Sequence, residues 1–178
     1  MQKINLYSPG GVCTRTIYKW LHKNDVRLNL QGDVHNGWNE DCDKIIYLFG
    51  NPVNCVTSFY GKELKSNNFI VPHSHNMKCK VTPPRDIENY DKDYFEIENH
   101  FNKYFYKKTK TPYIKVNYKY MWEEADKILN FLEIDEPLPE QAGRSRKGWL
   151  KNETLENLNK IYEKLIIQIE DLRVITNE

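Results

Sequence analysis

Apolar residues recur along this chain with two different periods, which predict alternating strands and helices. Lys3–Tyr7 and Lys44–Phe49 are short apolar runs typical of buried strands, and the second is the more apolar. Between them, Thr14–Lys23 carries apolar residues at helical spacing, and residues 26–30 alternate as a strand does. This alternation predicts an α/β fold, with a central parallel sheet flanked by helices in three layers.

The rest of the chain continues the pattern with longer helices. A helix is expected over residues 52–64, with Pro52 in its first turn. Residues 66–84 are polar and interrupted by prolines, which predicts an irregular surface excursion. Apolar spacing then predicts a helix over residues 86–106 and a strand over 113–118.

Two amphipathic helices complete the expected fold. The first carries Met121 to Leu132 on one face, and the second covers residues 154–174. Apolar residues of the second helix alternate at spacings of three and four over about 2.5 heptads, which is short for a coiled coil. We expect this helix to pack against the sheet; a dimer interface is the alternative.

Three separated segments have the character of anion-binding loops. Residues 5–16 pass from an apolar run through a glycine turn into a helix, and residues 44–60 form a second strand-to-helix junction. Residues 144–149 form a basic loop. Backbone N–H groups and the positive end of a helix attract anions at such junctions. Together the segments favour a nucleotide that carries two phosphate or sulfonate groups.

These segments resemble, in the same order, those of the sulfotransferases that use 3′-phosphoadenosine 5′-phosphosulfate (PAPS). Residues 12–16, Val-Cys-Thr-Arg-Thr, are similar to the Gly-Gly-Thr-Arg-Ala form of the 5′-phosphosulfate loop in heparan-type enzymes. Asn51, Pro52 and Ser58 fit the 3′-phosphate segment, and residues 146–148 match the Arg-Lys-Gly loop. The resemblance implies a P-loop-like α/β domain with PAPS as co-substrate and no metal. It also implies a glycan or small hydroxylated molecule as acceptor.

Roles for individual residues follow from this resemblance. The expected catalytic residues are His35 as the base, Asp33 as an orienting carboxylate or alternative base, and Arg15 as a stand-in for a missing lysine. A loop histidine and an exposed helix arginine are the simpler interpretations of His35 and Arg15. The residues expected to bind the nucleotide are Gly10, Gly11, Val12, Cys13, Thr14, Arg15, Thr16, Asn51, Ser58, Arg146, Lys147 and Gly148.

Two glycines depart from the family pattern. Gly11 stands where the family usually has a lysine or arginine, and Gly50 stands where it usually has the arginine that grips the 3′-phosphate. A charge-assisted hydrogen bond is worth about 1.5–3 kcal/mol, so the lack of two cations should weaken binding substantially. A nucleotide-binding domain without catalysis is therefore one alternative. A nucleotide kinase is another, although residues 10–16 lack the Gly-Lys-Ser/Thr ending of such enzymes.

Length and charge narrow the class of protein. The 178 residues form one domain, and the net charge of +1 favours neither nucleic acid nor membrane as a partner. No apolar stretch reaches the ~20 residues that span a bilayer, so we expect a soluble, intracellular protein. The abundance of Asn, Lys, Ile and Tyr is typical of a low-GC genome, such as that of a large DNA virus.

Other patterns give weaker signals. The four cysteines show no pairing motif, and His73, His75 and Cys79 lack an evident fourth metal ligand. Lysines 103–110 alternate with aromatic residues, but near-neutral overall charge favours a solvated basic face over a nucleic-acid site. A monomer or weak homodimer is expected, and a non-enzymatic interaction protein is a third alternative.

Overall fold

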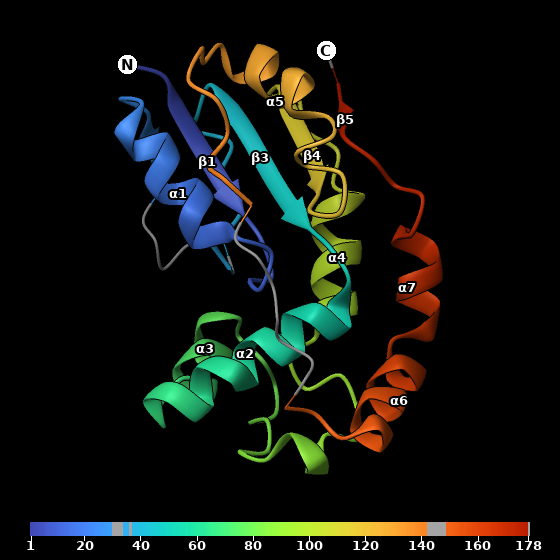
Figure 1. Cartoon of the computed structure of the whole chain (residues 1–178). Helices are drawn as coiled ribbons and strands as arrows, with labels where there is room; N and C mark the ends of the chain where they lie inside the picture. Colours follow the sequence, from blue (N-terminus) through green and yellow to red (C-terminus); the bar gives the residue numbers. More distant parts are fainter. Residues whose placement is uncertain (30–33, 36, 142–148, 178) are drawn as a thin grey trace.

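The computed structural model describes residues 1–29, 34–35, 37–141 and 149–177. Its centre is a five-stranded sheet in the order β2-β1-β3-β4-β5 (Figure 1). Neighbouring strands are parallel except β4 and β5, which are antiparallel. The expected mixed α/β fold with a mostly parallel sheet is confirmed. The antiparallel edge strand β5 was not predicted. The strands are β1 (Lys3–Tyr7), β2 (Arg27–Leu28), β3 (Lys44–Phe49), β4 (Tyr113–Asn117) and β5 (Ile175–Thr176).

Strand β3 lies in the middle of the sheet, and every one of its residues is buried. Successive side chains of a strand point to opposite faces, so both faces of β3 are covered. On one face, Phe49 packs edge-on against Phe101 and Phe105 of α4 (Ile97–Phe105). The prediction of a central, fully buried third strand is therefore confirmed.

The opposite face of β3 is covered by α5 (Ala125–Leu132). The Lys44 ammonium group crosses this face and donates to the Phe131 carbonyl at 2.5 Å. Helix α1 (Thr14–Lys23) is linked to the segment after α5, since the Trp20 indole N–H donates to the Pro137 carbonyl at 2.9 Å. Helix α1 has the predicted bounds, whereas α5 begins later than the predicted helix.

The strand order reverses between β1 and β3. Strand β1 leads to β2 on one side, and the chain then crosses to β3 on the other side. Such a reversal leaves a crevice at the carboxyl ends of the two strands, where open α/β sheets bind ligands. Figure 1 shows α2 (Pro52–Ser66) and α3 (Ile70–Asn76) beyond these carboxyl ends.

Helix α2 begins at Pro52 as predicted, but α3 was not foreseen. The Asn51 side chain caps α2 by accepting the Asn54 N–H at 3.2 Å. The Glu63 carboxylate of α2 caps α3 by accepting the Ile70 N–H at 2.8 Å. The expectation that residues 66–84 are wholly irregular is wrong, because α3 lies within this range.

Two long helices predicted from the sequence are each interrupted. Residues 86–106 form a short 3₁₀ helix, Ile87–Asn89, followed by α4, and the left-handed backbone of Glu96 (φ 50°) separates them. The last predicted helix divides into α6 (Asn152–Ile161) and α7 (Glu163–Ile169). Its apolar seam packs into the core, where α6 contacts α2. The buried members of that seam are Leu158, Tyr162, Leu165 and Ile169.

The second strand is shorter than predicted because a side chain replaces part of its backbone hydrogen bonding to β1. The Asn29 amide accepts the Leu6 N–H at 2.9 Å and donates to the Leu6 carbonyl at 3.1 Å. Strand β2 accordingly ends at Leu28. Within the described part of the chain, none of the helices combines the length and the apolar character needed to cross a bilayer.

Candidate functional site

The glycine loop, residues 8–13, joins the carboxyl end of β1 to the start of α1. Gly10 (φ 89°), Gly11 (φ 71°) and Cys13 (φ 62°) all have left-handed backbones, which turn the chain sharply. The Ser8 hydroxyl accepts the Gly10 N–H at 2.8 Å and bonds to the Thr14 hydroxyl at 2.5 Å. These contacts close the base of the loop and fix its shape.

The outer part of the glycine loop presents a run of backbone donors. Among the described residues, no acceptor takes the N–H groups of Gly11, Val12, Cys13, Thr14 and Arg15. The first helical residues ordinarily lack partners, but Gly11 and Val12 are also buried, where an unpaired N–H is unfavourable. Consecutive donors at a helix N-terminus form a concavity that favours an anion.

The two predicted phosphate-binding junctions lie in direct contact. A β-carbon added at Gly11 would lie 2.5 Å from the Cys55 Cα of α2. A β-carbon at Gly50 would lie 3.0 Å from Val12 Cγ1 and 3.2 Å from Tyr118 Cβ. The prediction that the glycine loop and the second junction meet is confirmed. This packing leaves no room for a side chain at Gly11, and a side chain at Gly50 would crowd Val12 and Tyr118.

The other predicted nucleotide-binding residues have different surroundings. The Asn51 side chain is engaged as the cap of α2, and Ser58 is buried on α2 with 3% exposure. Arg15 and Thr16 are exposed on the first turn of α1. The predictions for Asp33, Arg146, Lys147 and Gly148 fall outside the described residues.

His35, the predicted base, touches the glycine loop. Its Nδ1 lies 2.8 Å from the Ser8 carbonyl oxygen. Because a carbonyl can only accept, Nδ1 carries the proton and Nε2 keeps its lone pair. Burial lowers the pKa of His35, an effect that the bond to Ser8 partly offsets. A neutral ring with this tautomer is the form in which a histidine accepts a proton.

Two further histidines surround His35. The Nε2 of His100 donates to the His35 carbonyl at 3.0 Å, and its Nδ1 lies 3.2 Å from the Tyr47 hydroxyl. Burial lowers the pKa of His100 to about 3. The His73 ring meets the His35 ring edge-on, with 4.8 Å between centroids. Burial lowers the pKa of His73 well below its usual value, and His35 and the charge of Lys62 lower it further.

His73 also borders the glycine loop. A β-carbon at Gly10 would lie 3.2 Å from His73 Nε2 and 3.1 Å from Phe59 Cε1, so any other residue would crowd these rings. His73 Nε2 is the buried side-chain atom that lacks a hydrogen-bond partner in the described structure. The Pro9 backbone partly offsets the lowering of the His73 pKa.

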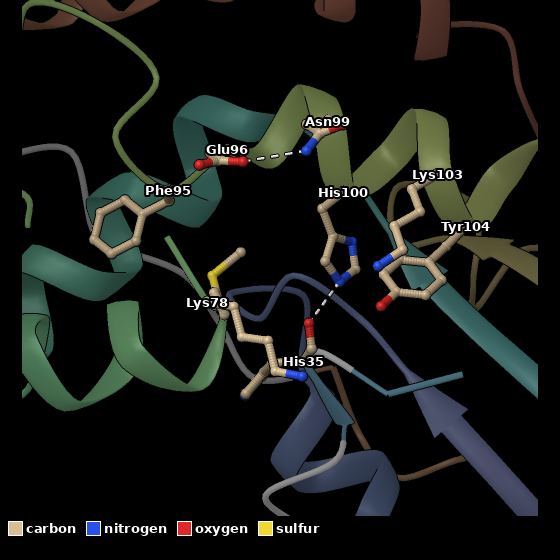
Figure 2. Close-up of a pocket in the computed structure, with 9 residues that line it drawn as sticks. His35, Lys78, Phe95, Glu96, Asn99, His100, Lys103 and Tyr104 are labelled. Atoms are coloured by element: carbon tan, nitrogen blue, oxygen red, sulfur yellow. Dashed lines mark hydrogen bonds between the residues drawn. The ribbon is translucent and has the colours of Figure 1, made fainter. Parts of the chain in front are cut away.

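A pocket of about 110 Å³ opens beside His35, between α3 and α4; we call it the α3–α4 pocket. Figure 2 shows Glu96 and Asn99 at its rim, His100 bonded to the His35 carbonyl, and Lys78 extending toward His35. The pocket therefore adjoins the predicted base. It is lined by His35, Met77, Lys78, Phe95, Glu96, Asn99, His100, Lys103 and Tyr104.

Most of this lining was not predicted as functional. The sequence indicates a solvated basic face for Lys103. For His73, which lies beside the pocket against His35, it suggests no role beyond an incomplete metal site. No group of three or more His, Cys, Asp or Glu side chains in the described ranges could hold a metal ion. His100 had one local signal, since it falls on the apolar side of a predicted helix beside Ile97 and Phe101.

No protein-family model, curated protein or solved structure matches this chain. Arguments about function therefore rest on the geometry of the glycine loop and of the α3–α4 pocket.

Proposed function

We propose that this chain binds PAPS with its 5′-phosphosulfate at the glycine loop and transfers the sulfonate to an acceptor in the α3–α4 pocket. The observation that carries the proposal is the run of backbone N–H groups from Gly11 to Arg15 without acceptors among the described residues. It lies where the strand order reverses, as a phosphate site in a P-loop-like fold would. The N-terminus of α1 adds a partial positive charge.

The contacts of His35 support a role in deprotonating the acceptor. His35 Nε2 takes the proton of the acceptor hydroxyl or amine while the acceptor atom forms a new bond to sulfur. The bond between sulfur and the bridging phosphate oxygen breaks, and adenosine 3′,5′-bisphosphate leaves. The Ser8 carbonyl holds Nδ1–H throughout, which keeps Nε2 available and stabilises the imidazolium that forms. The acceptor is a glycan or a small hydroxylated molecule.

Charge stabilisation at the transferring group requires cations from outside the two glycine positions. Neither Gly11 nor Gly50 supplies a cation: a β-carbon at Gly11 would collide with Cys55, and one at Gly50 would crowd Val12 and Tyr118. Arg15 at the first turn of α1 and the basic residues Arg146 and Lys147 are proposed to supply the positive charge. The two glycines favour, as a second candidate function, a domain that binds the nucleotide without transferring sulfonate.

Calorimetric titration distinguishes these functions from kinase-like chemistry. We expect micromolar binding of adenosine 3′,5′-bisphosphate and no binding of ATP, since the glycine loop lacks the lysine that holds a triphosphate. The reverse preference would contradict the proposal and favour a nucleotide kinase. Transfer of labelled sulfate from PAPS to a panel of glycans and phenols then separates the sulfotransferase from the nucleotide-binding domain that lacks transfer.

A further inference from the structure

The α3–α4 pocket has an excess of unpaired positive charge. Lys78 and Lys103 line it, and in the described part of the chain neither ammonium group takes part in an ion pair. The Lys103 ammonium group lies 5.1 Å from the centroid of the Tyr104 ring, a cation–π contact that leaves its charge unneutralised. The one acidic lining residue, Glu96, is already engaged, because its oxygens accept the Lys80 N–H and the Asn99 amide, each at 3.1 Å. The pocket therefore offers cations to a ligand while its carboxylate is occupied at the rim.

The backbone is strained where these charges enter the pocket. Lys78 (φ 58°) and Glu96 (φ 50°) both adopt the left-handed conformation, which is unfavourable for side chains other than glycine and asparagine. Lys78 directly follows the C-cap of α3, a position where glycine is the usual residue, and its N–H bonds to the His75 carbonyl at 2.9 Å. Strain of this kind concentrates at functional sites. At Lys78 the chain thus carries a cation in a conformation that glycine adopts at lower cost.

Further donors and apolar walls restrict what can bind. The Tyr104 hydroxyl has no hydrogen-bond partner among the residues that the structure describes, whereas the His100 Nε2–H is bonded to the His35 carbonyl. Met77 and Phe95 give the pocket apolar walls. A cavity of about 150 Å³ holds a benzene molecule. At about 110 Å³, this partly open pocket takes at most one ring with its substituent.

We propose that the α3–α4 pocket recognises a ligand through an oxyanion group, a carboxylate, phosphate or sulfate carried on a single ring. Lys78 and Lys103 neutralise the charge, the Tyr104 hydroxyl donates a hydrogen bond, and Met77 and Phe95 contact the ring. That this ligand is the sulfonate acceptor rests on the proposed function; that the pocket binds an oxyanion does not. The class of acceptor is then an acidic hydroxylated ring.

Matched pairs of small molecules test this inference. Binding of 4-hydroxybenzoate is compared with that of 4-hydroxybenzyl alcohol, and glucuronate with glucose, by following backbone and side-chain NMR shifts. Phenyl phosphate and phenyl sulfate then distinguish the kinds of oxyanion. We expect the acids to bind and to shift signals of Lys78, His100 and Tyr104, and the neutral partners to bind at least about tenfold more weakly.

Two variants separate binding from folding. Lys78→Gly removes the charge and also relieves the left-handed backbone, so it should raise the melting temperature while weakening acid binding about tenfold. Lys103→Gln should weaken acid binding similarly. Lys108→Gln removes an exposed charge outside the pocket and serves as the control, with unchanged binding. Equal binding of acids and neutral partners, or equal losses in all three variants, would overturn the inference.

Failure of this inference is distinguishable from failure of the proposed function. If adenosine 3′,5′-bisphosphate binds but the acids show no preference over their neutral partners, the pocket inference is wrong and the proposed function stands. If the acids bind with the expected dependence on both lysines but the bisphosphate does not bind, the pocket is an oxyanion site and the proposed function is wrong.

Discussion

The hydrogen bond from His35 Nδ1 to the Ser8 carbonyl determines which ring nitrogen can accept a proton. The same logic applies to His100, whose Nε2 must carry a proton to bond to the His35 carbonyl. The Tyr47 hydroxyl then donates to His100 Nδ1. Burial raises the pKa of Tyr47 well above its usual value, so this hydroxyl stays protonated. Three hydrogen bonds thus connect Tyr47 of the core strand β3, through His100 and His35, to the glycine loop.

Replacement of His35 tests its proposed role as the catalytic base. His35→Ala should lower the rate of sulfonate transfer about 10²–10⁴-fold, because removing a positioned base has effects of this size. Affinity for adenosine 3′,5′-bisphosphate should barely change, since the imidazole acts on the acceptor. Rates are measured with labelled PAPS, and His75→Ala, an exposed histidine of α3, is the control. Undiminished turnover in His35→Ala would shift the role to Asp33 or another group.

At the scale of elements, the sequence predicted those whose signals are local. The apolar runs of β1 and β3 and the Asn51-Pro52 cap of α2 are contained within a few residues. The helix expected over residues 86–106 was wrong because its apolar spacing continues across a break at Glu96. The Asp93 carboxylate stabilises the new start by accepting the Glu98 N–H at 3.0 Å. Apolar spacing does not detect such a cap.

The contact between the glycine loop and α2 makes a second prediction. Gly11→Ala should destabilise the fold by about 1–3 kcal/mol or more, because its β-carbon would lie 2.5 Å from Cys55 Cα and its φ is 71°. Gly61→Ala, in the middle of α2, meets nothing within 4 Å and should stabilise by about 0.5–1 kcal/mol. Urea unfolding measures both. Similar effects of the two substitutions would contradict the described packing of the loop.

At the scale of the whole molecule, the sequence predicted the meeting of the two strand-to-helix junctions better than it predicted what surrounds them. The meeting of the two strand-to-helix junctions follows from the order of elements in a parallel sheet. The approach of His73 and Lys78 to His35 does not, because it depends on α3 folding back over the glycine loop. The sequence did not predict α3, because the prolines and polar residues of the range 66–84 are typical of a loop. Contacts between distant segments leave no local pattern.

The buried histidines make the stability of the whole molecule depend on pH. His100 has a pKa of about 3 in the folded protein and about 6.5 when unfolded, so the unfolded chain binds more protons below pH 6.5. The contribution of His100 to the free energy of unfolding is complete above pH 6.5 and is smaller by about 2 kcal/mol at pH 5. The lowered pKa values of His35 and His73 act in the same direction. Partial burial raises the pKa of Asp93, which acts in the opposite direction at lower pH.

Urea unfolding at pH 7.5, 6 and 5 measures this loss of stability. We expect wild type to lose stability steadily as the pH falls. His100→Gln should be less stable at pH 7.5, because it disturbs two hydrogen bonds, but should lose less on acidification. His22→Gln replaces an exposed histidine and should follow wild type. An unchanged pH dependence in His100→Gln would contradict a neutral, buried His100.

The central claim is that the donors of the glycine loop bind the phosphate end of an adenosine nucleotide. Backbone amide NMR during titration with adenosine 3′,5′-bisphosphate tests it most directly. The account predicts saturable shifts of the Gly11, Val12, Thr14 and Arg15 amide signals, with much smaller shifts for exposed amides of α6 and α7. Binding that leaves the loop amides unshifted, or no binding at millimolar nucleotide, would contradict it.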